Sequence, residues 1–382
     1  MQRSDLPHPR SVRALIFFTS NTAWNVAHFR ASLLHAFAKR GFLLVALVPV
    51  DASVSKLQDM GCEVEPLTVR PHGRNLWADF LLFWSYIRLL RRYRPVALLS
   101  FTVKPNIYGG LAARLLGVPQ IGNISGLVTA FIQGGWLGKL VEWLYRLGLG
   151  GAKTVFFQNP DDRDLFLAKR LIREKQAALL PGSGVDLDYF KPLGERSAGE
   201  QNSFVFLFIG RLLGDKGLIE LLQAVKLLKD PAPRLLILGP LGGTNPTAIA
   251  PEVLAQWRQD PQVELLGPAD DVRSFVDAAD CVVLPSYREG TPRSLLEAAA
   301  MGKPLIATDV PGCRQVVQDG HNGYLCRVKD PHDLARAMRQ LMQLSPEQRQ
   351  VMGQASRKLA EEVFDEKLVV AKYLEALGLG EV

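Results

Sequence analysis

The amino-acid sequence predicts an α/β protein made of two similar domains, each built on a parallel sheet. Short apolar runs alternate with longer segments whose apolar residues recur at helical spacing, which is typical of β–α–β units. This alternation restarts after Pro181. The chain also has 382 residues, more than one hydrophobic core usually serves. We therefore expect two doubly wound domains that face one another across a cleft.

The first half opens with a clear strand and helix. Residues 14–19 form an apolar run suited to a buried strand. Residues 26–40 carry apolar side chains at helical spacing, and Gly41 is placed to end that helix. Further strands are expected at residues 42–48, 96–101 and 154–157.

The second half repeats the pattern. Its most apolar strand is expected at residues 204–209, followed by a helix at 218–228, and the polar, glycine-bearing stretch 194–203 suits a linker. The remaining strands are expected at residues 235–238, 263–265, 281–284 and 305–308. The expected units are residues 1–185 for the first domain, 186–360 for the second, and 361–382 for a terminal helix that can return to the first domain.

Composition and cysteine usage narrow the class of protein. Hydrophobic residues make up 48% of the chain and charged residues 22%, which is typical of globular domains. No apolar run reaches the roughly 20 residues that a membrane span needs. Because no C-x-x-C pair is present, we expect neither a zinc site nor a disulfide framework, and a reducing, cytoplasmic location. The four cysteines are Cys62, Cys281, Cys313 and Cys326.

The formal net charge of +7 fits several kinds of partner. Nucleic acid, an anionic membrane surface and phosphorylated substrates all attract a basic protein. The sequence has no zinc-finger spacing, RNA-binding aromatic motif or basic zipper, so nucleic acid is not expected as a partner. The position of the charge is therefore more informative than its total.

A basic turn follows the strand expected at residues 204–209. Its sequence, Gly210-Arg-Leu-Leu-Gly-Asp-Lys-Gly217, places Arg211 and Lys216 at the carboxyl end of that strand, where parallel sheets bind ligands. The planar guanidinium of arginine suits phosphate oxygens, lysine adds a mobile positive charge, and glycine lets the backbone approach a ligand closely. By itself, the segment also fits an ordinary charged turn.

A second motif, Glu289-Gly-Thr-Pro-Arg-Ser-Leu-Leu-Glu297, lies at the start of an expected helix. Thr291 fits the N-cap and Pro292 the first helical position. Free N–H groups at a helix start attract anions or polar oxygens, and the carboxylates of Glu289 and Glu297 can accept hydrogen bonds from hydroxyl groups. A capped helix with surface glutamates is the alternative.

Together, the two motifs resemble the donor site of glycosyltransferase family 4, whose members are retaining enzymes with the GT-B fold. The family's G-R-x-x-x-x-K-G stretch is similar to residues 210–217, and its two glutamates separated by seven residues are similar to Glu289 and Glu297. The resemblance begins at Pro181 and covers the rest of the chain. It also includes residues 182–186, 302–307 and 319–324.

The resemblance implies a nucleotide-sugar donor, with UDP as the expected nucleotide. Arg211 and Lys216 would bind its diphosphate and stabilise the leaving nucleotide, while residues 267–271 would lie beside the base. Glu289 would contact the sugar and Glu297 the ribose. The expected catalytic residues are Glu289, Arg211 and Lys216, and the expected donor-binding residues are Gly210, Arg211, Lys216, Glu289, Gly290, Thr291, Pro292 and Glu297.

These positive charges suit a mechanism without a metal ion, since they can neutralise a departing diphosphate. Asp186-Leu-Asp188 is formally a D-x-D sequence, which holds manganese in other glycosyltransferases. It lies in the expected inter-domain segment, and we interpret it as structural. We therefore expect no metal ligands and no cofactor.

The first half resembles a bacterial branch of the family in residues 100–109 and 123–127. Members of that branch add sugars, often N-acetylhexosamines, to polyprenyl-diphosphate-linked saccharides for surface polysaccharide or protein glycosylation. Many other family members have a histidine near the Pro-Asn pair, where this chain has Val103-Lys104. The expected acceptor-binding residues are Asn25, His28, Arg30, Lys104 and Asn106.

Two segments combine aromatic and basic residues. Residues 76–94 are apolar around much of an expected helix and end in arginines, and residues 135–146 are similar but shorter. Tryptophan and tyrosine suit the headgroup level of a membrane, and arginine attracts anionic lipid. We expect peripheral contact with the inner face of the cell membrane, and packing on the first sheet is the alternative.

The expected function is therefore retaining transfer of a sugar from a UDP-sugar to a polyprenyl-diphosphate-linked saccharide. A non-catalytic nucleotide-sugar-binding or scaffold protein of the same pathway is the alternative, which the missing histidine keeps open. A hydride-transferring enzyme would need G-x-G-x-x-G after its first strand, where this chain has Ser20-Asn-Thr-Ala-Trp24. The sequence leaves open which sugar moves and to which position.

Overall fold

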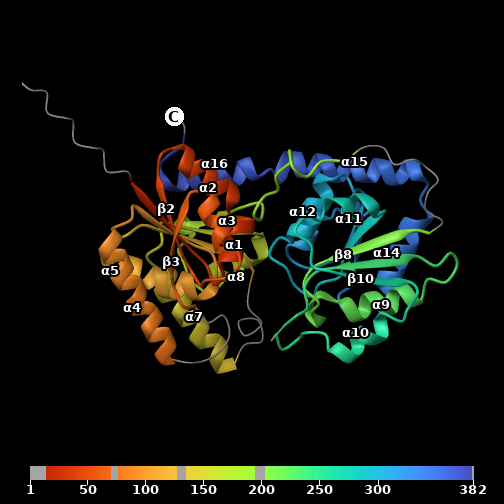
Figure 1. Cartoon of the computed structure of the whole chain (residues 1–382), viewed down its shortest axis with the longest axis horizontal. Helices are drawn as coiled ribbons and strands as arrows, with labels where there is room; N and C mark the ends of the chain where they lie inside the picture. Colours follow the sequence, from red (N-terminus) through yellow and green to blue (C-terminus); the bar gives the residue numbers. More distant parts are fainter. Residues whose placement is uncertain (1–13, 70–75, 127–134, 194–202, 244, 381–382) are drawn as a thin grey trace, which may run out of the picture.

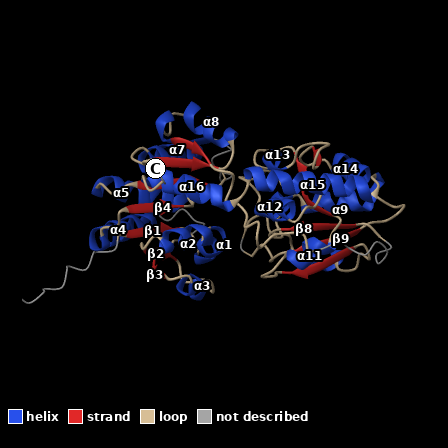
Figure 2. Cartoon of the chain, turned by 90° about the horizontal axis from the view of Figure 1, so that it is seen from above, coloured by secondary structure: helices blue, strands red, loops and turns tan. Residues whose placement is uncertain are grey.

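The computed structural model describes residues 14–69, 76–126, 135–193, 203–243 and 245–380. These residues form two lobes, each built on a parallel sheet that helices cover (Figures 1 and 2). The predicted α/β class with two Rossmann-like domains is confirmed. The expected linker lies, apart from its last residue, outside the described residues.

The sheet of the first lobe has seven strands. They are β1 (Leu15–Thr19), β2 (Leu43–Val48), β3 (Cys62–Pro66), β4 (Ala97–Ser100), β5 (Gln120–Ile124), β6 (Thr154–Phe157) and β7 (Ala177–Leu179). Their order in space is β3-β2-β1-β4-β5-β6-β7, and all neighbours are parallel. The central strands β1 and β4 are almost wholly buried, because helices cover both faces of a parallel sheet.

The helices of the first lobe pack on both faces of this sheet (Figure 2). They are α1 (Ala23–Phe29), α2 (Ala31–Lys39), α3 (Val54–Asp59), α4 (Leu76–Tyr93), α5 (Gly110–Leu116), α7 (Gly135–Leu149) and α8 (Pro160–Ala168), with the shorter turns η1 (Pro105–Gly109) and η2 (Glu174–Gln176). Leu33 and Phe37 of α2 belong to the core on one face, while Tyr86 of α4 and Ala113 of α5 belong to the core on the other.

The sheet of the second lobe has six parallel strands. They are β8 (Val205–Ile209), β9 (Arg234–Leu238), β10 (Val263–Gly267), β11 (Cys281–Leu284), β12 (Leu305–Thr308) and β13 (Gly323–Cys326). Their order is β10-β9-β8-β11-β12-β13. The helices after them are η3 (Gly214–Lys216), α9 (Leu218–Lys226), α10 (Pro251–Trp257), α11 (Arg273–Ala278), α12 (Arg293–Ala300), α13 (Cys313–Val316), α14 (Pro331–Gln343), α15 (Pro346–Val363) and α16 (Glu366–Leu377). Within the described residues, no helix is both long and apolar enough to cross a membrane.

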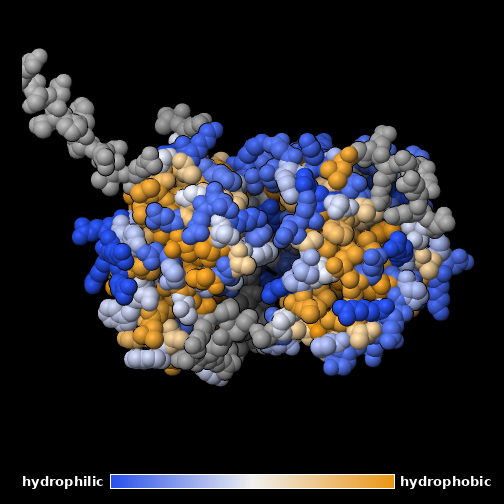
Figure 3. Space-filling view, in the orientation of Figure 1, coloured by the Kyte–Doolittle hydropathy of each residue, from blue (hydrophilic) through white to orange (hydrophobic). Residues whose placement is uncertain are grey.

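Each sheet has a point where the strand order reverses. β4 lies beside β1 in the first sheet, and β11 lies beside β8 in the second. Ligands of such sheets bind outside the carboxyl ends of the strands at this point. The loops after β1, β4, β8 and β11 are therefore the first places to look for a site, and a furrow separates the two lobes (Figure 3).

The chain crosses between the lobes twice, and the two crossings are bonded together. Val185 N donates to Phe364 O at 2.8 Å, and Glu366 N donates to Val185 O at 3.1 Å. Beyond the second crossing, α16 packs on the first sheet (Figure 1). Tyr373 is buried in that core, and its hydroxyl accepts a hydrogen bond from Asn123 Nδ2 at 3.0 Å.

The single helix expected at residues 26–40 is two helices in the structure. α1 and α2 are separated by Arg30, which leaves the helical conformation with φ −130° and ψ 12°. The side chain of Arg30 is buried, and its guanidinium carbon lies 4.5 Å from the centre of the Phe101 ring. Gly41 follows α2 with a φ of +83°, as expected for a residue that ends a helix.

Candidate active site

The two motifs singled out in the sequence meet at the carboxyl ends of β8 and β11. The ammonium of Lys216, in η3, forms an ion pair with the carboxylate of Glu289, in the loop between β11 and α12. The two side chains are 23% and 13% exposed, so the pair is largely shielded from water. Beside it, Tyr287 N donates to Asp215 O at 2.9 Å. The basic turn and the β11–α12 loop therefore form one site.

Gly217 allows the basic turn to approach that loop. Its φ of +72° lies in the left-handed region, and a Cβ at this position would lie 2.0 Å from Pro285 O. Any side chain would therefore strain the backbone and collide with the main chain that follows β11. The glycine is what permits Lys216 to reach Glu289.

α12 begins one residue later than the sequence suggests. Pro292 occupies the cap position, and the first helical residue is Arg293. Thr291, expected as the N-cap, bonds to the first lobe: its Oγ1 donates to Gln158 O at 2.8 Å, and its N–H donates to Gln158 Oε1 at 3.2 Å. The N-cap prediction is wrong, because this hydroxyl is used in a contact between the lobes.

Glu297 lies near the start of α12, where the lobes approach each other. Burial raises the pKa of its carboxyl, and the guanidinium of Arg293 opposes that shift through an ion pair of 2.8 Å between Nε and Oε1. The same guanidinium lies 5.7 Å from the ring of Phe29, a residue of the first lobe. Glu297 and Arg293 thus lie near the junction of the two lobes, with side chains that are 13% and 21% exposed.

Arg211 is exposed and lies in the same basic turn as Lys216. Within the described part of the chain, its side chain makes no hydrogen bond or ion pair. The guanidinium of Arg211 is therefore available to an anion. In the loop after β10, by contrast, Asp271 is already paired. Arg273, the first residue of α11, bonds to it at 2.6 Å, and this bond lowers the pKa of Asp271 to about 2.

Two of the expected acceptor residues have buried polar atoms that lack a partner. Arg30 Nε and Nη1, and Asn25 Oδ1, make no hydrogen bond among the described residues. Burial also lowers the pKa of the Arg30 guanidinium. A buried polar group without a partner costs about 1–3 kcal/mol, so such groups suit a polar or anionic ligand.

His28 faces the second lobe from α1. Its ring stacks on that of Trp24 with centroids 4.6 Å apart, and its Nδ1 donates to Trp24 O at 2.9 Å. The Lys56 ammonium donates to Nε2 at 3.4 Å, which requires a neutral ring. Burial is the main cause that lowers the pKa of His28, and two charges of the second lobe, on Arg293 and Asp270, also act on it.

The last two expected acceptor residues are used within the first lobe. The Lys104 ammonium pairs with Asp79 of α4 at 2.7 Å. Asn106 is buried, and its amide bonds on both sides: Oδ1 accepts from Ser100 Oγ at 2.7 Å, and Nδ2 donates to Asn123 O at 2.8 Å. Lys104 and Asn106 therefore join the elements around β4 and β5.

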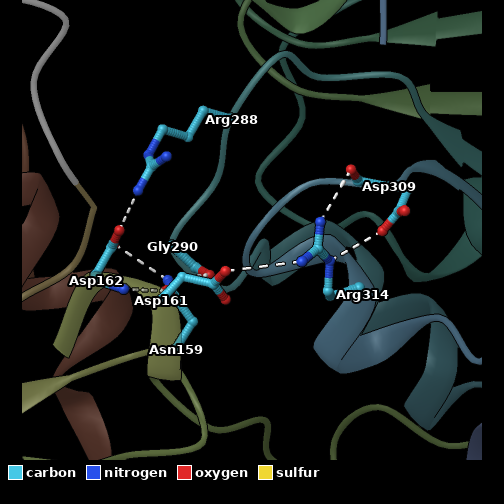
Figure 4. Close-up of polar contacts among 7 residues, drawn as sticks. All are labelled: Asn159, Asp161, Asp162, Arg288, Gly290, Asp309 and Arg314. Atoms are coloured by element: carbon cyan, nitrogen blue, oxygen red, sulfur yellow. Dashed lines mark hydrogen bonds and ion pairs between the residues drawn. The ribbon is translucent and has the colours of Figure 1, made fainter. Parts of the chain in front are cut away.

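Sequence reasoning missed a contact between the β6–α8 turn and the β11–α12 loop. The Arg288 guanidinium pairs with the carboxylate of Asp162, which is fully buried. Asn159 Nδ2 donates to Gly290 O at 3.2 Å and to Asp162 Oδ2 at 3.1 Å (Figure 4). In the sequence, Asn159 indicates only an N-cap for α8, which it also provides.

A second, more exposed contact between the lobes lies at α13. Arg314 Nη1 is 3.7 Å from Asp161 Oδ1 across the lobes, whereas Arg314 Nε is 2.9 Å from Asp309 Oδ1 of its own lobe (Figure 4). These side chains are 40% to 57% exposed. Ion pairs so exposed contribute little to stability, so this contact is the weaker of the two.

Two family profiles match the chain. The one described as "Glycosyl transferase 4-like domain" matches residues 26–182, and the one described as "Glycosyl transferases group 1" matches residues 194–359. Together they cover both lobes. The chain is a glycosyltransferase of the GT-B fold.

Curated relatives of this glycosyltransferase include bacterial enzymes named for lipid-linked acceptors. A Campylobacter jejuni protein, N,N'-diacetylbacillosaminyl-diphospho-undecaprenol alpha-1,3-N-acetylgalactosaminyltransferase, is 26% identical over 374 residues, which is 94% of this chain and 97% of the relative. An Escherichia coli protein, UDP-Gal:alpha-D-GlcNAc-diphosphoundecaprenol alpha-1,3-galactosyltransferase, is 25% identical over 276 residues, 69% of this chain and 70% of that one.

Solved structures share the fold of the glycosyltransferase. The Anabaena protein HepE in complex with UDP-glucose superposes with a TM-score of 0.79 at 18% identity, covering 95% of this chain and 99% of that one. WaaG, a glycosyltransferase involved in lipopolysaccharide biosynthesis, gives 0.72 at 16% identity, covering 96% and 100% of the two chains. Among the described residues of the glycosyltransferase, no group of three or more His, Cys, Asp or Glu is arranged to hold a metal ion.

Proposed function

We propose that this glycosyltransferase moves an N-acetylhexosamine or a related sugar, with retention, from a UDP-sugar to a polyprenyl-diphosphate-linked saccharide in surface-polysaccharide or glycoprotein-glycan assembly. The observation that carries the donor half is the ion pair of Lys216 with Glu289 at the carboxyl ends of β8 and β11. The acceptor half is supported by the near full-length Campylobacter relative, whose name specifies a diphospho-undecaprenol acceptor.

The donor lies against the second lobe. Cleavage of a sugar–phosphate bond leaves negative charge on the departing diphosphate, and Arg211 and Lys216 offset that charge. Glu289 contacts the sugar together with the main chain of residues 290–292, and Glu297 accepts a hydrogen bond from the ribose. Because the ion pair holds Lys216 beside Glu289, the phosphate contact and the sugar contact are adjacent, as the two groups are in the donor.

These cations make a metal ion unnecessary for the departure of the diphosphate. Asp186, the first residue of the D-x-D sequence, has a structural role: its Oδ1 accepts from the N–H groups of Asp188 and Tyr189 at 2.9 and 3.0 Å. Asp188 is 88% exposed and lies 3.5 Å from the Lys367 ammonium. Both carboxylates therefore belong to the segment that links the lobes.

The acceptor lies against the first lobe, so that residues 1–185 bind the acceptor, residues 186–360 bind the donor, and residues 361–382 complete the first domain. Arg30 and Asn25 supply the buried atoms without partners, and His28 faces the second lobe beside them. Lys104, whose charge is paired with Asp79, lies in the segment after β4, and the hydrogen bonds of Asn106 support that segment.

One face of α4 brings the enzyme to the cytoplasmic surface of the membrane. Trp77, Phe80, Leu81 and Trp84 follow one another at helical spacing and are 48% to 68% exposed. A row of exposed apolar side chains costs free energy in water and suits insertion among lipid headgroups. The exposed arginines at the other end of the segment are Arg88, Arg91, Arg92 and Arg94.

α7 presents a second aromatic face. Trp136, Leu140 and Trp143 recur at helical spacing and are 70%, 37% and 54% exposed. α4 and α7 project on the same side of the first lobe (Figure 1), and α5 packs against both. Two such faces on one side of the acceptor-binding lobe suit an acceptor whose polyprenyl tail remains in the bilayer.

The function is tested in two steps. A thermal-unfolding screen of UDP and UDP-sugars identifies the donor, because bound ligand raises the unfolding temperature by mass action. The preferred donor is then incubated with polyprenyl-diphosphate-linked saccharides, and UDP release and product mass are measured. Stabilisation by UDP-N-acetylhexosamines with transfer to a lipid-linked acceptor is expected. Absence of stabilisation by UDP and every UDP-sugar would contradict the proposal.

A further inference from the structure

The loop that carries Glu289 is held from the first lobe on both sides of that residue. Arg288 is paired with Asp162, and Gly290 O accepts from Asn159. The next residue of the loop, Thr291, is bonded to Gln158 through both its N–H and its hydroxyl. Contacts from one short turn of the first lobe thus surround the glutamate that the proposed function assigns to the sugar.

The loop also has almost no space in which to move. A Cβ at Gly290 would lie 2.2 Å from Ser125 O and 2.7 Å from Gln158 Oε1, both in the first lobe. On the other side, a Cβ at Gly312 would lie 1.7 Å from Gly290 O. Main chain from each lobe therefore closes on Gly290, and its position depends on both lobes.

We propose that Gln158, Asn159 and Asp162 are positioning residues for sugar transfer. They hold the β11–α12 loop so that Glu289 reaches the reacting sugar only when the first lobe is seated against the second. Binding of the nucleotide needs no such contact, because the groups assigned to it lie in the second lobe. The inference rests on the proposed role of Glu289, and it adds a dependence of that role on the partner domain.

Burial distinguishes these residues from an ordinary surface contact. Asp162 is fully buried and Asn159 is 1% exposed. A buried carboxylate is costly without a partner, and Asp162 has two, Arg288 and the Asn159 amide. Burial raises the pKa of Asp162, and the Arg288 charge opposes that shift. The exposed contact of Arg314 with Asp161 lacks these features.

A double-mutant cycle across the two lobes tests the inference. Asp162→Asn, Arg288→Ala and the double variant are compared with wild type for kcat, measured as UDP release, and for UDP affinity, measured by calorimetry. We expect each single change to lower kcat by about tenfold or more, since small misplacements of reacting groups are costly. The double variant should lose no more than either single one, because the pair acts as a unit. UDP affinity should stay within about twofold of wild type.

Two further variants separate positioning from loss of the fold. Arg288→Lys keeps the charge and should recover part of kcat. Arg327→Ala, at a residue 76% exposed with partners only in its own lobe, should match wild type. Thermal unfolding identifies any variant that does not fold. If Asp162→Asn fails to fold, the partly exposed Arg288 still carries the comparison of alanine with lysine.

Hydrogen exchange of the peptide that spans residues 285–292 gives a readout without substrate. Faster exchange of this peptide is expected in Asp162→Asn and Arg288→Ala. Unchanged exchange with wild-type kcat in both variants would overturn the inference, as would strictly additive losses in the double variant. If exchange accelerates but wild-type enzyme transfers no sugar, the contact stands and the proposed function fails.

Discussion

At the scale of single residues, the site depends on charges brought close together by glycine. Lys216 and Glu289 are separated by 73 positions in the chain, and they meet because Gly217 lets one turn lie directly on the main chain of the other. Arg211 lies in the same turn as Lys216, and its side chain is exposed. The arrangement gives one cation that is held by the fold and one that is free to follow a diphosphate.

Removal of either charge at this site should abolish most of the transfer. Glu289→Ala and Arg211→Ala are each expected to lower turnover by about 10²–10³, which is typical of losing one group that stabilises developing charge. Arg211 is exposed, so its removal should leave the unfolding temperature nearly unchanged, whereas Glu289→Ala leaves the shielded Lys216 ammonium without its partner and should lower that temperature modestly. UDP release and thermal unfolding measure the two effects, with Arg327→Ala as the matched control. Turnover like that of wild type in either folded variant would remove the donor-site assignment.

The half-buried position of His28 predicts a pH dependence of stability. Its pKa in the folded protein is lowered from 6.5, so the unfolded chain binds the proton more readily. The stability that the neutral ring confers is complete above that value, and it is lost as the pH falls through the folded pKa. His28→Gln should therefore reduce the fall in unfolding temperature between about pH 8 and about pH 5.

The matched control for this prediction is His35→Gln, which removes an exposed histidine of α2. It should leave the difference between the two pH values as in wild type. An equal fall in wild type and in His28→Gln would show that His28 does not contribute. Differential scanning fluorimetry in matched buffers is sufficient for the comparison.

Residues whose partners are close in the sequence could be predicted, and others could not. The basic turn and the paired glutamates lie in two short segments, so their motifs are visible in the chain. The burial of Arg30 over Phe101 depends on a contact between α1 and the end of β4. Likewise, the partner of Thr291 is Gln158, 133 positions away. Nothing in local spacing indicates either contact.

At the scale of elements, α4 combines a buried side with an exposed one. Tyr86 and Leu90 are buried in the core of the first lobe, while Trp77 and Trp84 are 68% and 50% exposed. The buried side of α4 packs on the sheet, and the exposed side is the one that the proposed membrane contact would use. The arginines lie at the end of the helix that leads into β4.

Charge reversal along this helix should weaken binding to anionic membranes. Each arginine near such a surface contributes about 1 kcal/mol, so replacing four with glutamate should weaken binding to liposomes containing anionic lipid by two to three orders of magnitude, roughly. Activity on a lipid-linked acceptor should fall, and activity on a short water-soluble acceptor much less. The four changes are Arg88→Glu, Arg91→Glu, Arg92→Glu and Arg94→Glu.

A control with the same change in net charge distinguishes position from total charge. It replaces four exposed arginines of the second lobe with glutamate and should bind liposomes far better than the α4 variant. These residues are Arg234, Arg258, Arg327 and Arg339. Absence of liposome binding by wild type, or equal loss in both variants, would leave α4 with a packing role only.

Strands built from apolar runs were predictable, whereas strands with polar or alternating residues were missed. β5 contains Gln120 and Asn123, both buried, and their partners Ser100 and Tyr373 come from distant elements. β3 alternates polar and apolar residues because it lies at the edge of its sheet. β7 has three residues and β13 four, too few to form a pattern.

At the scale of the whole molecule, the proposed chemistry relies on side-chain cations of the second lobe. Transfer should therefore persist in excess EDTA, because the departing diphosphate meets Arg211 and Lys216 rather than a bound ion. UDP release with and without EDTA measures this directly. Complete loss of activity that magnesium or manganese restores would reverse the interpretation of Asp186 and Asp188.

From the sequence, only the general arrangement of two domains that face one another could be predicted. The restart of the strand–helix pattern after Pro181 indicates two domains, but it contains no information on which surfaces meet. That choice is made by particular polar groups, such as Asp162 with Arg288, whose sequence neighbours suggest only a capped helix and a loop. The sequence therefore does not predict which residues make the contacts between the domains.

The return of α16 to the first lobe has a consequence for how the protein is made. Domains usually fold in the order in which they leave the ribosome, the N-terminal one first. Here Tyr373 fills the core of the first lobe and accepts from Asn123, 250 positions earlier. That core lacks the aromatic ring of Tyr373 until the ribosome has passed the whole second lobe. The first lobe is thus completed only after the second lobe has been synthesised, and in that interval its unfinished core is exposed to aggregation.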